Sequence, residues 1–277
     1  MSLKVIKAGI LDTVQDLGRF GFQYLGVNPG GVMDPFATQV VNMLVGNNSN
    51  EAVIEMHFPA SAFLFEKESL IAIGGADFSP TIDGDPIPLW HPVLINKNSV
   101  LHFEKIRSGA RCYLAIKDGL EIPQWLNSRS TNLRALAGGF YGRALQKNDA
   151  IGFKKQNDYT AFLSHKGFLV LPWQAATNWD PLADEWIDIT FGNEWDWLDE
   201  VSQKKFLNDT FIIKTASDRM GYRLNGNTII ATNKMELISS AVSFGTIQLL
   251  PDGQLIVLMA DHQTAGGYPR IAHVITA

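Results

Sequence analysis

Most apolar stretches of this chain are short, and Gly, Pro, Asn or Asp residues separate them. Residues 186–191 alternate between apolar and polar side chains, which is typical of a half-buried strand. Five other runs are almost continuously apolar and predict buried strands, at residues 112–116, 168–171, 211–213, 255–259 and 271–275. Many short strands with frequent turn signals favour antiparallel sheets curled into barrels or sandwiches. The predicted fold class is therefore mainly β, with a few short helices.

Two segments have the apolar spacing of helices instead. Asp34 followed by Pro35 is a favourable start, because Asp can cap the first turn and Pro fits the first helical position. The apolar residues that follow fall on one face, and Gly46 supplies the stop. A second helix is predicted from about Asp196 to Phe206, with Trp197, Leu198, Val201 and Phe206 as its main apolar residues.

A faint internal duplication runs through the chain. An Asp followed closely by Gly, then a Glu, then a strand that ends in Ala-Asp occurs twice in this order. The two copies lie at residues 16–22, 55 and 73–77, and at residues 218–224, 236 and 258–261. The elements are short, so chance remains an alternative to a true duplication. A duplication would place the boundary in the polar stretch near residues 155–165, which predicts domains at residues 1–160 and 161–277.

Composition and charge exclude several classes of protein. The 277-residue chain is 46% hydrophobic and 18% charged, which is ordinary for one large or two modest globular domains. Its net charge is −5 and its charges are interspersed, so we expect no nucleic-acid partner and no membrane surface. The N-terminus lacks the apolar core of a signal peptide, and no run approaches the ~18 apolar residues of a membrane span. These features predict a cytoplasmic protein.

The sequence shows no self-contained nucleophile or metal site. The single cysteine, Cys112, lies in an apolar run and is expected to be a buried hydrophobe rather than a nucleophile. The six histidines lack metal-ligand spacing, and no metal is predicted. The chain has no Gly-x-Ser-x-Gly elbow, no P-loop and no GxGxxG motif. Chemistry is therefore expected in loops that carry Gly and Arg.

Two such loops lie in the N-terminal half. Residues 9–34 contain Arg19, a residue type that binds carboxylates and phosphates with two hydrogen bonds, and five glycines between residues 18 and 31. Residues 128–143 combine three arginines with the hydroxyls of Ser128, Ser130 and Thr131 and a Gly-Gly pair. Such segments bind anions, but they also form hairpins and solvated rims of sheets. Residue spacing alone leaves both interpretations open.

Two more candidate segments lie in the C-terminal half. Residues 217–223 place Arg219 and Arg223 near Asp218, and as an isolated string they are more typical of a turn between strands. Residues 261–270 follow an apolar strand and carry acceptors, donors, a hydroxyl and a cation. A rigid strand that delivers a polar Gly-rich loop is a common way to build a site. His262 lies in this loop as a possible acid or base, although a lone His is more often structural.

Taken together, five ordered motifs resemble one family. They are Thr-Val-Gln-Asp-Leu-Gly-Arg at 13–19, Gly-Gly-Val-Met-Asp at 30–34, Ser-Arg-Ser-Thr at 128–131 with Gly-Gly-Phe-Tyr-Gly-Arg at 138–143, Ser-Asp-Arg-Met-Gly-Tyr-Arg-Leu at 217–224, and Asp-x-Gln-Thr-x-Gly-Gly-Tyr-Pro-Arg at 261–270. This order is similar to the allophanate hydrolase subunit 2 family, also called the biotin-dependent carboxyltransferase family, subdomains A and B. Its stand-alone bacterial members are the C-type subunits of 5-oxoprolinase. The resemblance extends from about Val5 to Thr276.

The resemblance implies a fold, partners and a reaction. The fold would be two cyclophilin-like β-barrel units. The partners would be a B-type 5-oxoprolinase subunit and an A-type 5-oxoprolinase subunit, and the complex would use ATP to open 5-oxo-L-proline to L-glutamate. Cations that offset phosphate charge are expected as catalytic residues, namely Arg129, Arg143 and Arg219. The residues expected to bind substrate or anion are Gln15, Arg19, Gly30, Gly31, Arg223, Gln248, Gln263, Thr264, Tyr268 and Arg270.

Two other functions stay open beside this one. The chain could be the carboxyltransferase component of a biotin-dependent urea carboxylase, but it has no Met-Lys-Met biotinylation signal of its own. It could also act without catalysis, as a partner-binding antagonist of a kinase inhibitor. Two departures from the family are visible: His262 stands where many relatives have Arg, and the chain ends at Ala277, soon after the last motif. The second unit is therefore expected to lack a final strand or to have a shortened tail.

Overall fold

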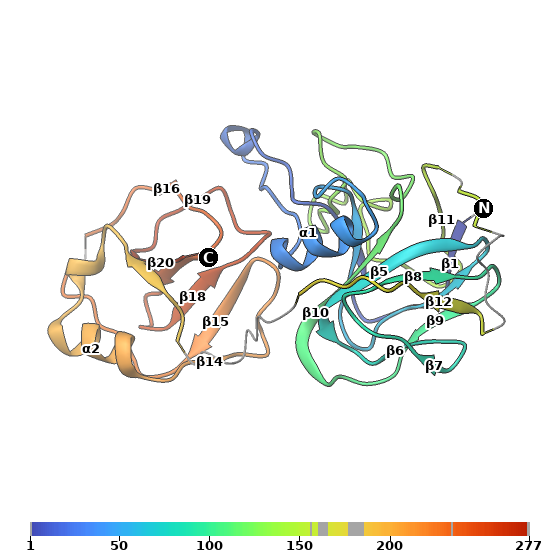
Figure 1. Ribbon diagram of the computed structural model, residues 1–277. Helices are drawn as coiled ribbons and strands as arrows, with labels where there is room; N and C mark the ends of the chain where they lie inside the picture. The colour runs from blue at the N-terminus through green and yellow to red at the C-terminus, as the bar shows by residue number, and fades with distance from the viewer. Residues whose placement is uncertain (1, 156, 160–165, 177–185, 234, 276–277) are drawn as a thin grey trace. The chain divides into compact units, whose positions relative to one another are not determined.

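The computed structural model describes residues 2–155, 157–159, 166–176, 186–233 and 235–275 (Figure 1). The chain forms two compact units. The first contains residues 1–19 and 30–178, and the second contains residues 20–29 and 179–277. The boundary expected between residues 160 and 161 lies outside the described residues. The second unit thus includes a short segment from near the N-terminus, which the sequence did not predict.

Two six-stranded sheets form the first unit, and every strand pair in them is antiparallel. The first sheet has the order β11 (Ala150–Gly152), β1 (Ser2–Lys7), β4 (Ala62–Phe65), β9 (Val100–Phe103), β6 (Pro80–Ile82) and β7 (Asp85–Pro86). The second has the order β12 (Phe168–Val170), β8 (Pro92–Ile95), β5 (Ser69–Asp77), β10 (Ser108–Ile116), β3 (Val53–Met56) and β2 (Thr13–Gln15). The mainly β class is confirmed, while closure of either unit into a barrel stays a prediction.

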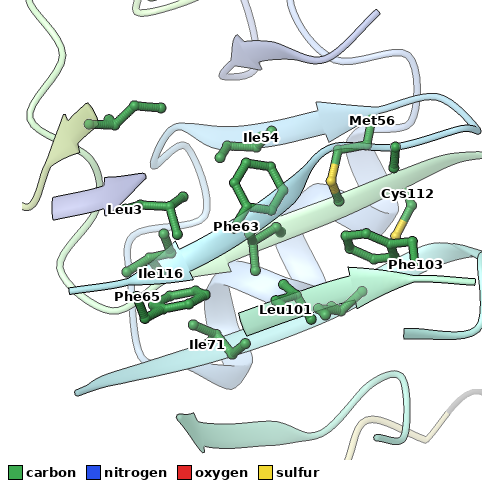
Figure 2. Close-up of a cluster of buried hydrophobic side chains, with 14 of the residues drawn as sticks. Leu3, Ile54, Met56, Phe63, Phe65, Ile71, Leu101, Phe103, Cys112 and Ile116 are labelled. Atoms are coloured by element: carbon green, nitrogen blue, oxygen red, sulfur yellow. The ribbon is translucent and has the colours of Figure 1, made fainter. Parts of the chain in front are cut away.

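The main core of this unit is built from both sheets, and β10 shows how (Figure 2). Cys112, Leu114 and Ile116 alternate along the strand and join the core that also contains Phe63 of the first sheet. Tyr113, one residue out of phase, belongs to a second cluster on the opposite face. Successive side chains of a strand point to opposite faces, so both faces of β10 are covered. This explains why the sequence is apolar without alternation at residues 112–116, and it places Cys112 as a fully buried side chain.

Helix α1 (Pro35–Leu44) covers the other face of the second sheet. Its start is the one predicted, because the Asp34 carboxylate accepts a hydrogen bond from the Ala37 N–H at 2.9 Å. Ala37 and Val41 pack in the second cluster, which includes Tyr113 and Ala115 of β10. In the described ranges, no helix is long and apolar enough to cross a membrane.

The second unit has one six-stranded antiparallel sheet and one two-stranded sheet. The large sheet has the order β13 (Ile189–Phe191), β20 (Arg270–Val274), β17 (Thr246–Leu249), β18 (Leu255–Leu258), β15 (Gly221–Asn225) and β14 (Ile212–Ile213). The small sheet pairs β16 (Ser240–Ala241) with β19 (Ala265–Gly266). Short 3-10 helices lie at Gln23–Leu25 and Trp195–Trp197, and helix α2 spans Glu200–Asn208. Trp195 is central to the core, where its ring stacks on Phe191 with centroids 4.2 Å apart.

Two sequence predictions for this unit were wrong in detail. The helix expected from Asp196 begins at Glu200, because Leu198 is extended and the Asp199 carboxylate caps the N–H of Ser202 at 2.6 Å. Val201, expected in the core, is 61% exposed. The strand expected at residues 211–213 exists as β14, but its two isoleucines are exposed. β14 is the edge of the sheet, and apolar composition alone does not distinguish an edge strand from a central one.

Of the elements in the proposed duplication, the turn at the Asp occurs in both halves of the structure, whereas the surroundings of the Glu differ between them. Asp16 accepts a hydrogen bond from the N–H two residues ahead, at Gly18 (2.9 Å), and Asp218 does the same for Met220 (2.8 Å). These are equivalent Asx turns. Glu55, however, is fully buried in β3, whereas Glu236 is exposed and outside any strand. The two halves therefore share a local turn but differ at the Glu position.

We expect Val41→Ala to destabilise the first unit by about 2 kcal/mol, because it removes two buried methyl groups between α1 and the sheet. Urea denaturation of the purified chain measures the change. Met43→Ala is the matched control on the same helix, since Met43 is 67% exposed and its loss leaves the core intact. Equal destabilisation by both variants would contradict the packing of α1 described above.

Candidate functional site

The buried carboxylate of Asp16 joins two of the predicted motifs in the first unit. One oxygen accepts hydrogen bonds from the hydroxyls of Ser128 (2.7 Å) and Ser130 (2.6 Å) and from the N–H of Gly18. The other oxygen accepts a hydrogen bond from the backbone N–H of Arg129 at 2.6 Å. Because Asp16 is almost completely buried, these donors replace the water that a carboxylate would otherwise need. The motif at 13–19 and the motif at 128–131 are therefore one structure.

Gln15 and Arg19, both predicted to bind substrate or anion, flank this carboxylate and are buried. The Gln15 amide donates to the Thr13 hydroxyl (3.0 Å) and to the Thr131 carbonyl (3.3 Å). Within the described residues, the amide oxygen of Gln15 accepts no hydrogen bond. The Arg19 guanidinium donates to the Ser130 carbonyl and lies over the Trp125 ring, 4.6 Å from its centroid.

Gly138 and Gly139 close this arrangement because a side chain does not fit at either position. A Cβ on Gly138 would collide with the Ser130 carbonyl and crowd the Arg19 guanidinium. A Cβ on Gly139 would collide with the Thr131 hydroxyl. Both residues also have positive φ, 66° and 52°, which favours glycine. The third motif thus packs against the first two through its glycines.

A second buried acid orders the predicted loop at Gly30 and Gly31. Glu55 accepts hydrogen bonds from the Met33 N–H (2.7 Å) and from the Tyr113 hydroxyl (3.0 Å). The Tyr113 hydroxyl in turn accepts a hydrogen bond from the backbone N–H of Asp34 at 2.9 Å. Burial, followed by the nearby Glu55 carboxylate, raises the pKa of Tyr113 well above its usual value. The phenol stays protonated and links the glycine loop to the start of α1.

Arg129 and Arg143 differ in what holds their guanidinium groups. Arg129 donates Nε–H to the Ile122 carbonyl at 3.1 Å and forms no ion pair within the described residues. Arg143 makes two hydrogen bonds with Asp149, at 2.7 and 2.8 Å, and these raise the pKa of Arg143. Both residues lie in the second candidate segment, but only Arg129 belongs to the network around Asp16.

In the second unit, Arg219 and the 261–270 loop meet. The buried guanidinium of Arg219 forms two hydrogen bonds with Asp261, at 2.8 and 3.1 Å. The side chain of Asn28 donates to the Asp261 carbonyl at 3.1 Å. The candidate segment at 9–34 and the fourth motif therefore converge on Asp261, the first residue of the fifth motif. Arg223, four residues on from Arg219, is exposed on β15, and its guanidinium forms no ion pair with any described carboxylate.

Two glutamines predicted as ligand contacts lie near Gly266 in the same loop. A Cβ on Gly266 would stand 2.7 Å from the Gln248 amide nitrogen and 3.1 Å from that of Gln263. Gln248 donates to the Tyr268 carbonyl at 3.4 Å, and the Tyr268 side chain is exposed. The cluster also contains Thr264, whose carbonyl accepts the Val242 N–H at 3.3 Å. These side chains can offer amide and hydroxyl groups to a ligand.

His262 and Arg270 have structural partners. His262 is buried, its Nδ1 lies 2.6 Å from the Gln263 carbonyl, and burial lowers the pKa of its imidazole. Arg270 donates through its backbone N–H (2.8 Å), Nε (3.0 Å) and Nη2 (2.8 Å) to the buried carboxylate of Glu194. The hydrogen bonds from Arg270 to Glu194 raise the pKa of Arg270. Arg270 thus holds the end of the loop to the turn at Glu194.

Most of the predicted site residues therefore form two clusters, one in each unit, while Arg143 and Arg223 lie outside them. The first cluster contains Gln15, Arg19, Gly30, Gly31 and Arg129; the second contains Arg219, Gln248, Gln263, Thr264, Tyr268 and Arg270. Sequence reasoning missed the acids that organise them: Asp16 and Glu55 in the first unit and Glu194 in the second. The sequence signal that could have identified these acids was the repeated occurrence of Asp or Glu beside the Gly and Arg motifs. In the part of the chain that the structure describes, no group of acidic, His or Cys residues could hold a metal.

We expect the Glu194–Arg270 pair to contribute to stability rather than to ligand binding. Glu194→Ala and Arg270→Ala should each destabilise the chain, and the double variant should lose less than the sum, with a coupling of about 1–3 kcal/mol. Denaturation of the four proteins in a double-mutant cycle measures this. Additive losses would mean that Arg270 acts independently of Glu194 and is available to a ligand.

Comparison with known proteins identifies the family. A family model described as the carboxyltransferase domain, subdomain A and B, matches residues 25–277. The C-type 5-oxoprolinase subunit of Haemophilus influenzae is 34% identical over 265 residues, which cover 96% of this chain and 82% of that protein. The C-type 5-oxoprolinase subunit of Escherichia coli is 34% identical over 277 residues, 99% of this chain and 85% of that protein. Urea amidolyase of Saccharomyces cerevisiae is 31% identical over 81% of this chain, but only 12% of that protein is covered.

Solved structures agree with this result. The crystal structure of TTHA0988 has a TM-score of 0.84 and 26% identity, and it covers 99% of this chain and 51% of the TTHA0988 chain. The Kluyveromyces lactis Urea Carboxylase also gives a TM-score of 0.84 at 26% identity, with 25% of that chain covered. This chain thus spans about half or less of these solved chains. The resemblance read from the five motifs is confirmed: the chain belongs to the carboxyltransferase domain family, subdomains A and B.

Proposed function

We propose that this chain is a subunit of a cytoplasmic, ATP-dependent 5-oxoprolinase complex that opens 5-oxo-L-proline to L-glutamate. The observation that carries the proposal is the similarity to two proteins named as C-type subunits of 5-oxoprolinase, over 96% and 99% of this chain and most of each relative. The other components would be a B-type subunit and an A-type subunit.

The chemistry of lactam opening indicates what the predicted site residues would contribute. Transfer of a phosphoryl group from ATP to the amide oxygen would make the ring carbonyl a better electrophile. Cations then offset phosphate charge, and amide or hydroxyl donors hold the substrate carboxylate. Arg129 and Arg223 fit the first task, because no described carboxylate pairs with their guanidinium groups. Gln263 and Tyr268 fit the second. We assign ATP to the complex and not to a particular protein within it.

A second candidate is the carboxyltransferase component of a biotin-dependent urea carboxylase. Its support is the similarity to urea amidolyase and to the solved urea carboxylase, which extends over 81% and 99% of this chain. In both relatives the matching region is a small part of a longer chain. Biotin on a separate carrier protein would then be the cofactor. The two proposals differ in substrate, so one assay distinguishes them.

Reconstitution tests the proposed function. The chain is purified with its B-type and A-type partners and incubated with ATP and 5-oxo-L-proline, and glutamate is measured. We expect glutamate formation only with ATP and all three proteins. No glutamate, together with transfer of carboxyl groups from carboxybiotin to urea, would replace the proposal with the second candidate. Tight binding of the partner without either reaction would favour the non-enzymatic, partner-binding role.

We expect Arg129→Ala and Arg223→Ala each to lower kcat/KM for 5-oxoproline by about 100-fold or more, the effect seen when a donor to developing negative charge is removed. The measurement is ATP-dependent glutamate formation by the reconstituted complex. Arg107→Ala is the matched control, since Arg107 is an exposed arginine outside both clusters, and its variant should keep wild-type turnover. Full activity of Arg129→Ala or Arg223→Ala, with wild-type melting temperature, removes that residue from the site.

A further inference from the structure

Gly266 is a glycine at a position whose backbone conformation does not require one. It lies in β19, where it pairs antiparallel with Ser240 of β16, and its φ is not positive. A strand residue in this conformation accepts a side chain without backbone strain. Gly138 and Gly139 differ in this respect, since both have positive φ. The groups that surround Gly266, rather than its own conformation, therefore explain the glycine.

Two carboxamides occupy the space that a side chain at position 266 would need. A Cβ on Gly266 would stand 2.7 Å from Nε2 of Gln248 and 3.1 Å from Nε2 of Gln263, both closer than an ordinary van der Waals contact. Gln248 reaches this place from β17, and Gln263 reaches it from the turn that follows β18. Two amide donors from separate elements thus converge on one face of Gly266, and the missing Cβ lets them do so.

The hydrogen-bonding capacity of both carboxamides is largely unused. Gln248 is 1% exposed, yet among the described residues its side chain makes one hydrogen bond, a long one of 3.4 Å to the Tyr268 carbonyl. The Gln263 side chain makes no hydrogen bond with any residue that the structure describes. Buried polar side chains are normally satisfied, and each carboxamide carries two N–H donors. One donor of Gln248 and two of Gln263 can therefore serve a ligand.

Converging amide donors favour a ligand that offers two acceptor oxygens close together. A carboxylate has two such oxygens, and its charge makes the hydrogen bonds that it accepts stronger than those of a neutral carbonyl. The acid of the same loop, Asp261, does not repel such a ligand strongly, because the Arg219 guanidinium holds it through two hydrogen bonds and offsets its charge. The face of Gly266 is thus suited to a small carboxylate.

We propose that the face of Gly266 is the subsite for the carboxylate of 5-oxoproline, with Gln248 and Gln263 as its donors and Gly266 as the residue that determines specificity for it. The inference rests on the proposed function and assigns one part of that substrate to one place in the chain. The carboxylate and the lactam carbonyl of 5-oxoproline are on different ring carbons. The subsite therefore selects and orients the substrate, while the bond that breaks lies elsewhere.

The test compares Gly266→Ala with the wild type in the reconstituted complex. The new Cβ would push against the far ends of two flexible side chains, so the melting temperature should be kept while the amides are displaced. We expect the KM for 5-oxo-L-proline to rise about tenfold or more, the effect of losing hydrogen bonds to a charged group, with little change in kcat. 2-Pyrrolidinone, the same lactam without the carboxylate, should compete with an unchanged Ki. Gln263→Leu, which removes one carboxamide at similar volume, should show the same difference between the two ligands.

Gly267→Ala is the matched control, because its Cβ would approach the Leu237 carbonyl (3.3 Å) and the Ser239 hydroxyl (3.5 Å) but neither glutamine, and both constants should stay at wild-type values. An equal rise in KM and in the Ki of 2-pyrrolidinone would show that Gly266 only shapes the loop. An unchanged KM in Gly266→Ala and Gln263→Leu would remove the amides from the site. Either result overturns the carboxylate subsite and leaves the proposed function intact, whereas a wild-type complex that forms no glutamate overturns both.

Discussion

The N-terminal cluster depends on one buried carboxylate, that of Asp16. Its two oxygens accept four hydrogen bonds, three of them from residues more than 110 positions away in the sequence. A buried charge is costly unless donors surround it, so the loop at 128–131 and the carboxylate stabilise each other. Arg19 and the Gly138–Gly139 pair then pack on the backbone that this network fixes. The geometry of residues 15–19, 128–131 and 138–139 thus depends on satisfying one acid, whereas Glu55 orders the loop that follows Gly31.

The arginines show why a list of cations does not identify a site. Arg143, Arg219 and Arg270 are each joined to an acid by two or more hydrogen bonds. An arginine paired in this way fixes two loops together and offers little net charge to an incoming anion. Arg129 and Arg223, by contrast, form no ion pair with a described acid, and Arg19 is held by the Ser130 carbonyl and the Trp125 ring. Structure therefore separates arginines that build the clusters from arginines that can serve a ligand.

The sequence predicted the structural features that depend on residues close together in the chain. Helix α1 starts at Pro35 as expected, because the cap at Asp34 and the proline act within one turn. The buried face of β10 was expected as well. The exposure of β14 was not, since an edge strand differs from a central strand only in its neighbours. The role of Asp16 was also missed, because the residues that donate hydrogen bonds to it are close in space but distant in the sequence.

The segment at residues 13–34 shows how distant parts of the sequence build both clusters. Its first part is bound into the first unit through Asp16, and Asn28 is bound into the second through the Asp261 carbonyl. Asp261 also holds Arg219, so one continuous stretch of chain contributes hydrogen bonds to both clusters. The sequence could not predict this arrangement, because each end of the segment binds residues that follow it by more than 110 positions along the chain.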